Sequence, residues 1–273
     1  MGEIVWAACV SHAGGQLRVR ESATEQERMD RVYAGWEQLR GSLEQAELDA
    51  LIVVGTDHMF TFSTDLMPTL TLGRGDVYET WGELGNQIRD VRASAGLSDA
   101  LHRSLVADDF DVASATGMRL DHAYACPLEL LDPDGRMAVV PLSINVFVPP
   151  LPSFRRCRDL GAALRSAVAS QEEAGRIGVL ATGGISHWVG VPETGRINPE
   201  WDQEFLDWFE APDLDRLDSI TPHEFRDAAG PGAGELLCWM VALGAAGSRG
   251  AQRLLYEPVE AWITGIALVE VTV

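Results

Sequence analysis

The chain has 273 residues, of which 46% are hydrophobic, and it carries a formal net charge of −20. This acidic balance repels phosphate backbones and anionic lipid headgroups, so we expect no nucleic-acid or membrane partner. All 21 basic residues are arginines, and without lysine the chain cannot form a Schiff base with a substrate or with pyridoxal phosphate. No stretch reaches the roughly 18 consecutive apolar residues of a membrane span, which predicts a soluble, cytoplasmic protein.

A single domain over residues 1–273 is predicted, because no Pro/Ser-rich linker or charge block divides the chain. The four cysteines, Cys9, Cys126, Cys157 and Cys238, are widely separated and form no C-x-x-C pair. We therefore expect free thiols, some of them in the core, rather than a disulfide framework or a structural zinc site.

Short runs rich in Val, Ile and Leu alternate along the chain with segments of helical periodicity. Strands are expected at 4–10, 48–54, 112–116, 137–148 and 177–180. Helices are expected at 25–46, 97–108, from about Pro127, 156–173 and 200–210. Residues 74–96 fit neither pattern and suggest a short helix or a lid. The order predicts an α/β fold with a central mixed, largely parallel sheet flanked by helices and an active site at the strand carboxyl ends.

Three of the apolar runs lead directly into a histidine. Ile4 to Val10 is followed by His12, Leu51 to Val54 by His58, and Ile177 to Leu180 by His187. Because the carboxyl ends of parallel strands meet at one edge of a sheet, these three imidazoles are expected to converge. The remaining histidines include His102, expected on a helix surface, and His223, expected to have a structural role in a turn.

A carboxylate sits at the start of the most apolar segment of the chain. Glu235 follows Gly230-Pro231-Gly232-Ala233-Gly234 and runs into Leu236 to Leu243, which is apolar on nearly every face and is predicted to be a buried helix. An ionised carboxylate there is costly unless it is paired, hydrogen-bonded or bound to a metal. The alternative is an ordinary glutamate that favours the helix dipole and reaches solvent.

The histidines and Glu235 together form a typical metal-ligand set. Two histidines and one carboxylate on one face of an octahedral ion leave three positions open, as in non-haem Fe(II) oxygenases. We therefore assign His12, His58 and Glu235 to iron, and His187 and His122 to proton transfer.

Several short sequence segments, distributed over the whole chain, occur in the order in which one protein family has them. They are Ser11-His12, Asp57-His58 with Phe62 and Leu66-Met67-Pro68, Leu120-Asp121-His122 with Pro127-Leu128, Pro141 to Asn145 with Pro149-Pro150, Gly183 to His187, Asn198 to Asp202, and Gly234-Glu235 with the helix that follows. In this order they resemble the class III extradiol ring-cleavage dioxygenases, the family of the protocatechuate 4,5-dioxygenase catalytic subunit.

By this resemblance His12, His58 and Glu235 match the ferrous-iron ligands, His187 the active-site acid/base, and His122 a second active-site histidine. The resemblance implies an Fe(II)-dependent oxidoreductase of aromatic compound catabolism. Such an enzyme inserts both atoms of O2 into a catechol-type, aminophenol or hydroxypyridone ring and opens the ring. Some similar enzymes need a small accessory subunit, and a homodimer is the default expectation for the oligomeric state.

Two other classes of function remain open at this point. A zinc-dependent α/β hydrolase could use the same histidines and glutamate to activate water, and a non-catalytic member of the fold could bind a metal without turnover. The substrate is not readable from the sequence. Arg74, Arg119 and Arg155 are candidates to hold a substrate carboxylate, without a basis for choosing among them.

Overall fold

The computed structural model describes all residues, 1–273, and is built around one eight-stranded sheet. The strand order is β6-β3-β7-β2-β8-β1-β10-β9. The bounds are β1 Glu3–Val10, β2 Ala50–Gly55, β3 Leu70–Gly73, β6 Ala113–Ala115, β7 Val139–Ile144, β8 Arg176–Thr182, β9 Ala251–Val259 and β10 Thr264–Val271. The four central strands β7, β2, β8 and β1 run parallel, while antiparallel pairs occur toward both edges. This confirms the predicted mixed, largely parallel α/β fold.

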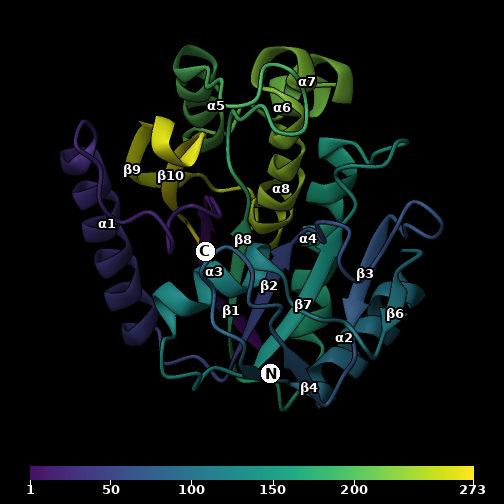
Figure 1. Cartoon of the computed structure of the whole chain (residues 1–273). Helices are drawn as coiled ribbons and strands as arrows, with labels where there is room; N and C mark the ends of the chain where they lie inside the picture. The colour runs from purple at the N-terminus through teal and green to yellow at the C-terminus, as the bar shows by residue number, and fades with distance from the viewer.

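Helices cover both faces of the sheet (Figure 1). Helices α1 (Gln26–Gln45) and α3 (His122–Leu131) pack on one face. Helices α2 (Ala95–Ala107), α4 (Phe154–Ala169) and α8 (Leu236–Ala245) pack on the other. Three further helices, α5 (Pro199–Glu210), α6 (Leu214–Ser219) and α7 (Pro222–Ala229), lie together at the top of Figure 1. None of the helices is long and apolar enough to cross a membrane.

The central strands are apolar on both faces because both faces are covered. In β2, Leu51 and Val53 pack against the α1 and α3 layer, whereas Ile52 and Val54 pack against the α4 and α8 layer. Side chains alternate between the two faces of a strand, so a strand buried on both sides must be continuously hydrophobic. Unbroken hydrophobic runs of this kind are the pattern from which we predicted buried strands.

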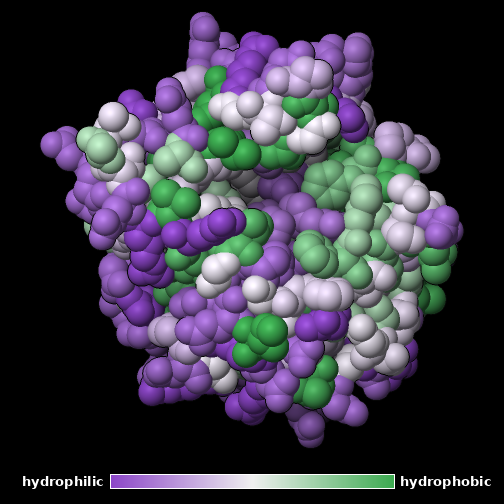
Figure 2. Space-filling view, viewed as in Figure 1, coloured by the Kyte–Doolittle hydropathy of each residue, from purple (hydrophilic) through white to green (hydrophobic).

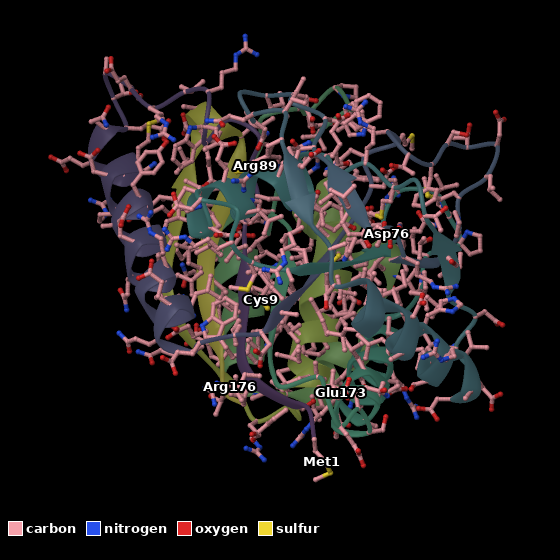
Figure 3. The ribbon with its side chains drawn as sticks, turned by 90° about the horizontal axis from the view of Figure 1, so that it is seen from below. Met1, Cys9, Asp76, Arg89, Glu173 and Arg176 are labelled. Carbon is pink, nitrogen blue, oxygen red and sulfur yellow. The ribbon has the colours of Figure 1, made fainter.

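The parallel strands all begin at one margin of the molecule and end at the other. Glu3 at the start of β1 pairs with Arg176 at the start of β8, and Met1, Glu173 and Arg176 lie near one another at the bottom of Figure 3. Cys9, near the end of β1, lies in the interior in the same view. All four cysteines are buried and free, as expected.

Three predicted elements differ from the structure. Helix α3 begins at His122 rather than near Pro127, because Asp121 caps it by accepting the backbone N–H of Ala123 at 2.9 Å, and Pro127 lies inside the helix. The strand expected at 137–148 is confined to β7, since the chain then turns at Asn145. Most of residues 74–96 form a hairpin of β4 (Val77–Glu79) and β5 (Asp90–Arg92) in place of the predicted short helix or lid, and the last two residues begin α2.

Candidate metal centre and active site

A cavity of about 330 Å³ opens beyond the carboxyl ends of the central strands. Five of its fifteen lining residues are the titratable groups singled out from the sequence: His12, His58, His122, His187 and Glu235. The others are small or apolar and include Leu84, Phe147, Val189, Trp262 and Ile263. Figure 2 shows a hollow near the middle of the face in view, with hydrophilic residues inside it and hydrophobic residues on its rim.

The strand ends bring the histidines to this cavity. His12 follows β1 directly, and the preceding Ser11 is held by its hydroxyl to the backbone of Gly265 and Ala267 on β10. His58 follows β2 in a turn closed by Asp57, whose carboxylate accepts the backbone N–H groups of Thr61 at 2.9 Å and Phe62 at 3.0 Å. These local bonds fix the direction in which each imidazole leaves the sheet.

Glu235 stands at the centre of the cluster. It is 2% exposed and ends the short 3-10 helix Pro231–Glu235 directly before α8. Its Oε1 lies 3.2 Å from Nε2 of His12 and 3.2 Å from Nε2 of His58, and its Oε2 lies 3.6 Å from Nε2 of His187. The solvent-reaching alternative for this glutamate is therefore wrong.

The charge state of Glu235 follows from these neighbours. Burial raises its pKa, but the charges of His12 and His187 and their hydrogen bonds outweigh burial and hold the pKa well below the ordinary range. The backbone N–H of Gly184 also donates to Oε2 at 2.6 Å. The carboxylate is thus ionised and available as a cation ligand.

His58 is oriented from behind by a second buried carboxylate, that of Asp121. Asp121 is fully buried, and its Oδ2 lies 3.2 Å from Nδ1 of His58 while also accepting the backbone N–H of His58 at 2.6 Å. Although burial lowers the pKa of His58, Asp121 and Glu235 raise it to about 10 when no cation is present. A carboxylate behind one imidazole nitrogen is the arrangement that aims the other nitrogen at a metal.

His122 lies against His58, with ring centroids 4.0 Å apart and the rings stacked. Ring nitrogens of His12, His58 and His122 lie within 4.8 Å of one another, so the three histidines form a possible metal-binding group of their own. Burial and the positive charge of His58 lower the pKa of His122. Nδ1 of His122 contacts Glu83 at 3.1 Å.

His187 enters from the loop after β8. Its Nδ1 lies 3.2 Å from the carbonyl oxygen of Ile185, and its backbone N–H donates to Ala229. The loop is anchored one residue earlier, where the backbone N–H and the hydroxyl of Ser186 both donate to Asp202, at 2.9 and 2.8 Å. Burial raises the pKa of Asp202 to about 6.

Three carboxylates of this site were not singled out from the sequence: Glu83, Asp121 and Asp202. Asp121 and Asp202 lie in the motif segments Leu120-Asp121-His122 and Asn198 to Asp202, which was the available signal. Glu83 lies in the hairpin 74–96, where no pattern was found. Asn145 does not line the cavity, but its side chain bonds the backbone of Phe147 and Val148 and so places Phe147 at the wall.

Other candidates lie elsewhere. His223 is exposed and pairs with Asp227, and His102 is half-buried, with Nε2 2.9 Å from the carbonyl oxygen of Val112. Arg74, Arg119 and Arg155 do not line the cavity; they pair with Asp99, Glu79 and Asp159.

The donor atoms fit a bound metal ion. Adjacent ligands of an octahedral ion with bonds of about 2.1 Å are separated by roughly 3 Å, which is close to the 3.2 Å that separates Oε1 of Glu235 from each imidazole nitrogen. His12 also has a buried Nδ1 without a hydrogen-bond partner. A mixed imidazole and carboxylate set of this kind suits Fe(II) and also Zn²⁺.

Known proteins share both the sequence pattern and the fold. The model of the family described as the catalytic LigB subunit of aromatic ring-opening dioxygenase matches residues 6–267. The chain is 37% identical over 157 residues to gallate dioxygenase of Pseudomonas putida, a match covering 56% of this chain and 46% of that protein, so it spans about half the length of that relative. It is 31% identical over 260 residues to 2,3-dihydroxyphenylpropionate/2,3-dihydroxicinnamic acid 1,2-dioxygenase of Paraburkholderia xenovorans, covering 78% of this chain and 81% of that protein.

Among solved structures, an uncharacterized protein of Escherichia coli K12 is similar in fold, with a TM-score of 0.63. The match covers 98% of this chain and 99% of that chain at 18% sequence identity.

Proposed function

The chain belongs to the family of LigB catalytic subunits of aromatic ring-opening dioxygenases, and we propose from this premise that it is an Fe(II)-dependent extradiol dioxygenase. Its substrate would be a catechol-type, aminophenol or hydroxypyridone ring, into which both atoms of O2 are inserted. The observation that carries the proposal is the convergence of His12 and His58 on one oxygen of the buried, ionised Glu235, at 3.2 Å each.

We propose His12, His58 and Glu235 as the iron ligands. His58 is supported in this role by Asp121, which accepts from Nδ1 and leaves Nε2 free to ligate. His122 is the other candidate, since its nitrogens lie near those of His12 and His58. When bound, Fe(II) would supply Lewis-acid chemistry that lowers the pKa of a substrate hydroxyl.

His187 would move the substrate proton. Its Nε2 faces Glu235 across 3.6 Å and lines the cavity, whereas its Nδ1 is engaged with the carbonyl oxygen of Ile185. Because a carbonyl oxygen only accepts, Nδ1 carries a hydrogen; with Glu235 bound to the metal instead of to His187, the neutral ring would present a lone pair at Nε2. An imidazole in that form takes a proton from a hydroxyl and later returns it.

The apolar wall of the cavity would hold the aromatic ring. Phe147 and Trp262 offer ring faces, and Leu84, Val189 and Ile263 offer aliphatic contacts. Such a wall would exclude water from the reacting atoms and orient the ring so that its two adjacent donor atoms face the histidines.

Anaerobic reconstitution with Fe(II), followed by O2 uptake against a panel of catechols, aminophenols and hydroxypyridones, tests the proposed function. Uptake of one O2 per substrate with a new ring-opened chromophore is expected. Firm retention of Zn²⁺ together with ester or amide hydrolysis and no O2 uptake would contradict it and favour a hydrolase. We also propose a cytoplasmic location, which the four free, buried cysteines support because thiols persist in a reducing compartment.

A further inference from the structure

The hairpin of residues 74–96 brings a carboxylate to the active site that no sequence motif marked. Its turn, between β4 and β5, carries Glu83 and Leu84, and Leu84 lines the cavity. Leu84 adopts a positive φ of 54°, and Gly82 and Gly85 on either side of this pair have φ of 76° and 90°. This turn places Leu84 at the cavity wall and Glu83 against His122.

The turn is attached to the segment that carries His122. Leu120 donates its backbone N–H to Glu79 and accepts that of Trp81, both at 2.9 Å. The guanidinium of Arg119 stacks on the ring of Trp81 at 3.9 Å and pairs with Glu79. Glu83 is thus held in place relative to His122 by backbone pairing on the preceding residues.

Glu83 contacts His122 twice with the same oxygen. Oε1 accepts the backbone N–H of His122, and it lies 3.1 Å from Nδ1 of the same residue. Burial raises the pKa of Glu83, but its hydrogen bond with His122 and other bonds outweigh burial and lower it, so the side chain is a carboxylate. A carboxylate only accepts hydrogen bonds, so Nδ1 of His122 must carry a hydrogen.

We propose that Glu83 is a positioning residue that fixes the ring of His122 in the tautomer with hydrogen on Nδ1, so that Nε2 presents a lone pair to the substrate. This inference rests on the proposed function, because it assigns a task to His122 in the same site. A neutral His122 in this tautomer accepts a hydrogen bond from a substrate hydroxyl or amino group; it does not donate one to bound oxygen.

A purely structural role for Glu83 would involve only its hydrogen bond with the backbone N–H of His122. A carboxylate at the start of α3 stabilises the helix by bonding its first N–H group and opposing its dipole. The contact to Nδ1 goes further, since it concerns a side chain that lines the cavity. The two roles therefore differ in what happens when the contact is removed: one changes stability, and the other changes turnover through His122.

Glu83→Gln and Glu83→Ala test the proposal, with Glu79→Gln as the matched control because Glu79 lies in the same hairpin, half-exposed, and pairs only with Arg119. Loss of a carboxylate that orients a metal-bound histidine costs about 10- to 100-fold, and we take the same magnitude for His122. We expect that loss in kcat for Glu83→Ala and a smaller one for Glu83→Gln, whose amide oxygen still accepts a hydrogen bond, with KM within about two-fold and unchanged iron content in both. The His122→Ala variant should lose no further activity when Glu83→Ala is added, because both changes remove one function.

A second readout is independent of turnover. In the diamagnetic zinc-loaded protein labelled with nitrogen-15 in histidine, NMR should show His122 protonated at Nδ1 in the wild type and a changed tautomer in Glu83→Ala, which removes the acceptor. Normal kcat and an unchanged tautomer in Glu83→Ala would overturn the proposal, as would additive losses with His122→Ala. Loss of iron in Glu83→Gln would also overturn it and make His122 a metal ligand. A wild type with the Nδ1–H tautomer and no ring cleavage would contradict the proposed function instead and leave the tautomer assignment standing.

Discussion

Gly232 lies against the imidazole of His187 with no room for a side chain. A Cβ placed on Gly232 would stand 2.1 Å from Nε2 and 2.2 Å from Cδ2 of His187, whereas ordinary contact begins at 3.4 Å. The ring must therefore shift by roughly 1 Å, because His187 is buried and Gly232 is itself tied by its backbone N–H to the carbonyl oxygen of His187. A shift of about 1 Å costs about 100-fold in rate when it misplaces a reacting group.

We expect Gly232→Ala to lower kcat by about 100-fold while iron content stays at the wild-type value, with a loss of about 1–3 kcal/mol in the free energy of unfolding from overpacking. Steady-state kinetics, metal analysis and thermal unfolding measure the three quantities. Gly117→Ala is the control, since a Cβ there meets nothing within 4 Å. Wild-type kcat in Gly232→Ala would refute the assignment of proton transfer to His187 Nε2.

Four other predictions address the ligands, the proton carrier, the support of the loop and the substrate. Glu235→Ala should lose iron, measured by metal analysis after gel filtration, and stoichiometric iron with a normal rate would make the ligand assignment wrong. His187→Phe should keep iron and lose most turnover; a kcat near the wild-type value would rule out its role. Burial raises the pKa of Asp202 from 3.8 to about 6, so ionisation of this buried carboxyl destabilises the folded state. This destabilisation is absent below about pH 4 and reaches its full value above about pH 6. Asn does not ionise, so between about pH 4 and about pH 6 the free energy of unfolding of Asp202→Asn should rise by about 3 kcal/mol relative to that of the wild type. Denaturant titrations in which the difference between the two proteins stays constant with pH would contradict this. The apolar wall without arginine should favour catechols with uncharged substituents, so kcat/KM should be higher for 4-methylcatechol than for protocatechuate, and the reverse order would show that another group binds the carboxylate.

The fold could be predicted because its signals are local. Strands buried on both faces need unbroken runs such as Leu51 to Val54, and one-sided helices need apolar spacings such as those of Met29, Val32 and Trp36, all of which are buried. The start of α3 was missed because Pro127 suggested a first turn, whereas the cap at Asp121 decided it. The hairpin 74–96 was missed because its strands are three residues long, too short to show alternation.

Three of the four histidines of the site, His12, His58 and His187, could be predicted because sheet topology alone brings strand ends together. The fourth, His122, begins α3, and its place in the site was predicted mainly from the resemblance. The supporting carboxylates could not be predicted, because each acts across the fold: Glu83 on His122, Asp121 on His58, and Asp202 on Ser186. Such contacts depend on how loops pack, and they produce no periodic pattern in the sequence. The roles of the five site residues, the homodimer and the accessory subunit stay predictions.

The most direct test of dioxygenase function is the fate of isotopically labelled O2. The Fe(II)-loaded protein is supplied with a catechol that it consumes, and the ring-opened product is analysed by mass spectrometry soon after mixing, before carbonyl exchange with water. We predict that both labelled oxygen atoms appear in the product. Incorporation of a single labelled atom, or of oxygen from water alone, would contradict it.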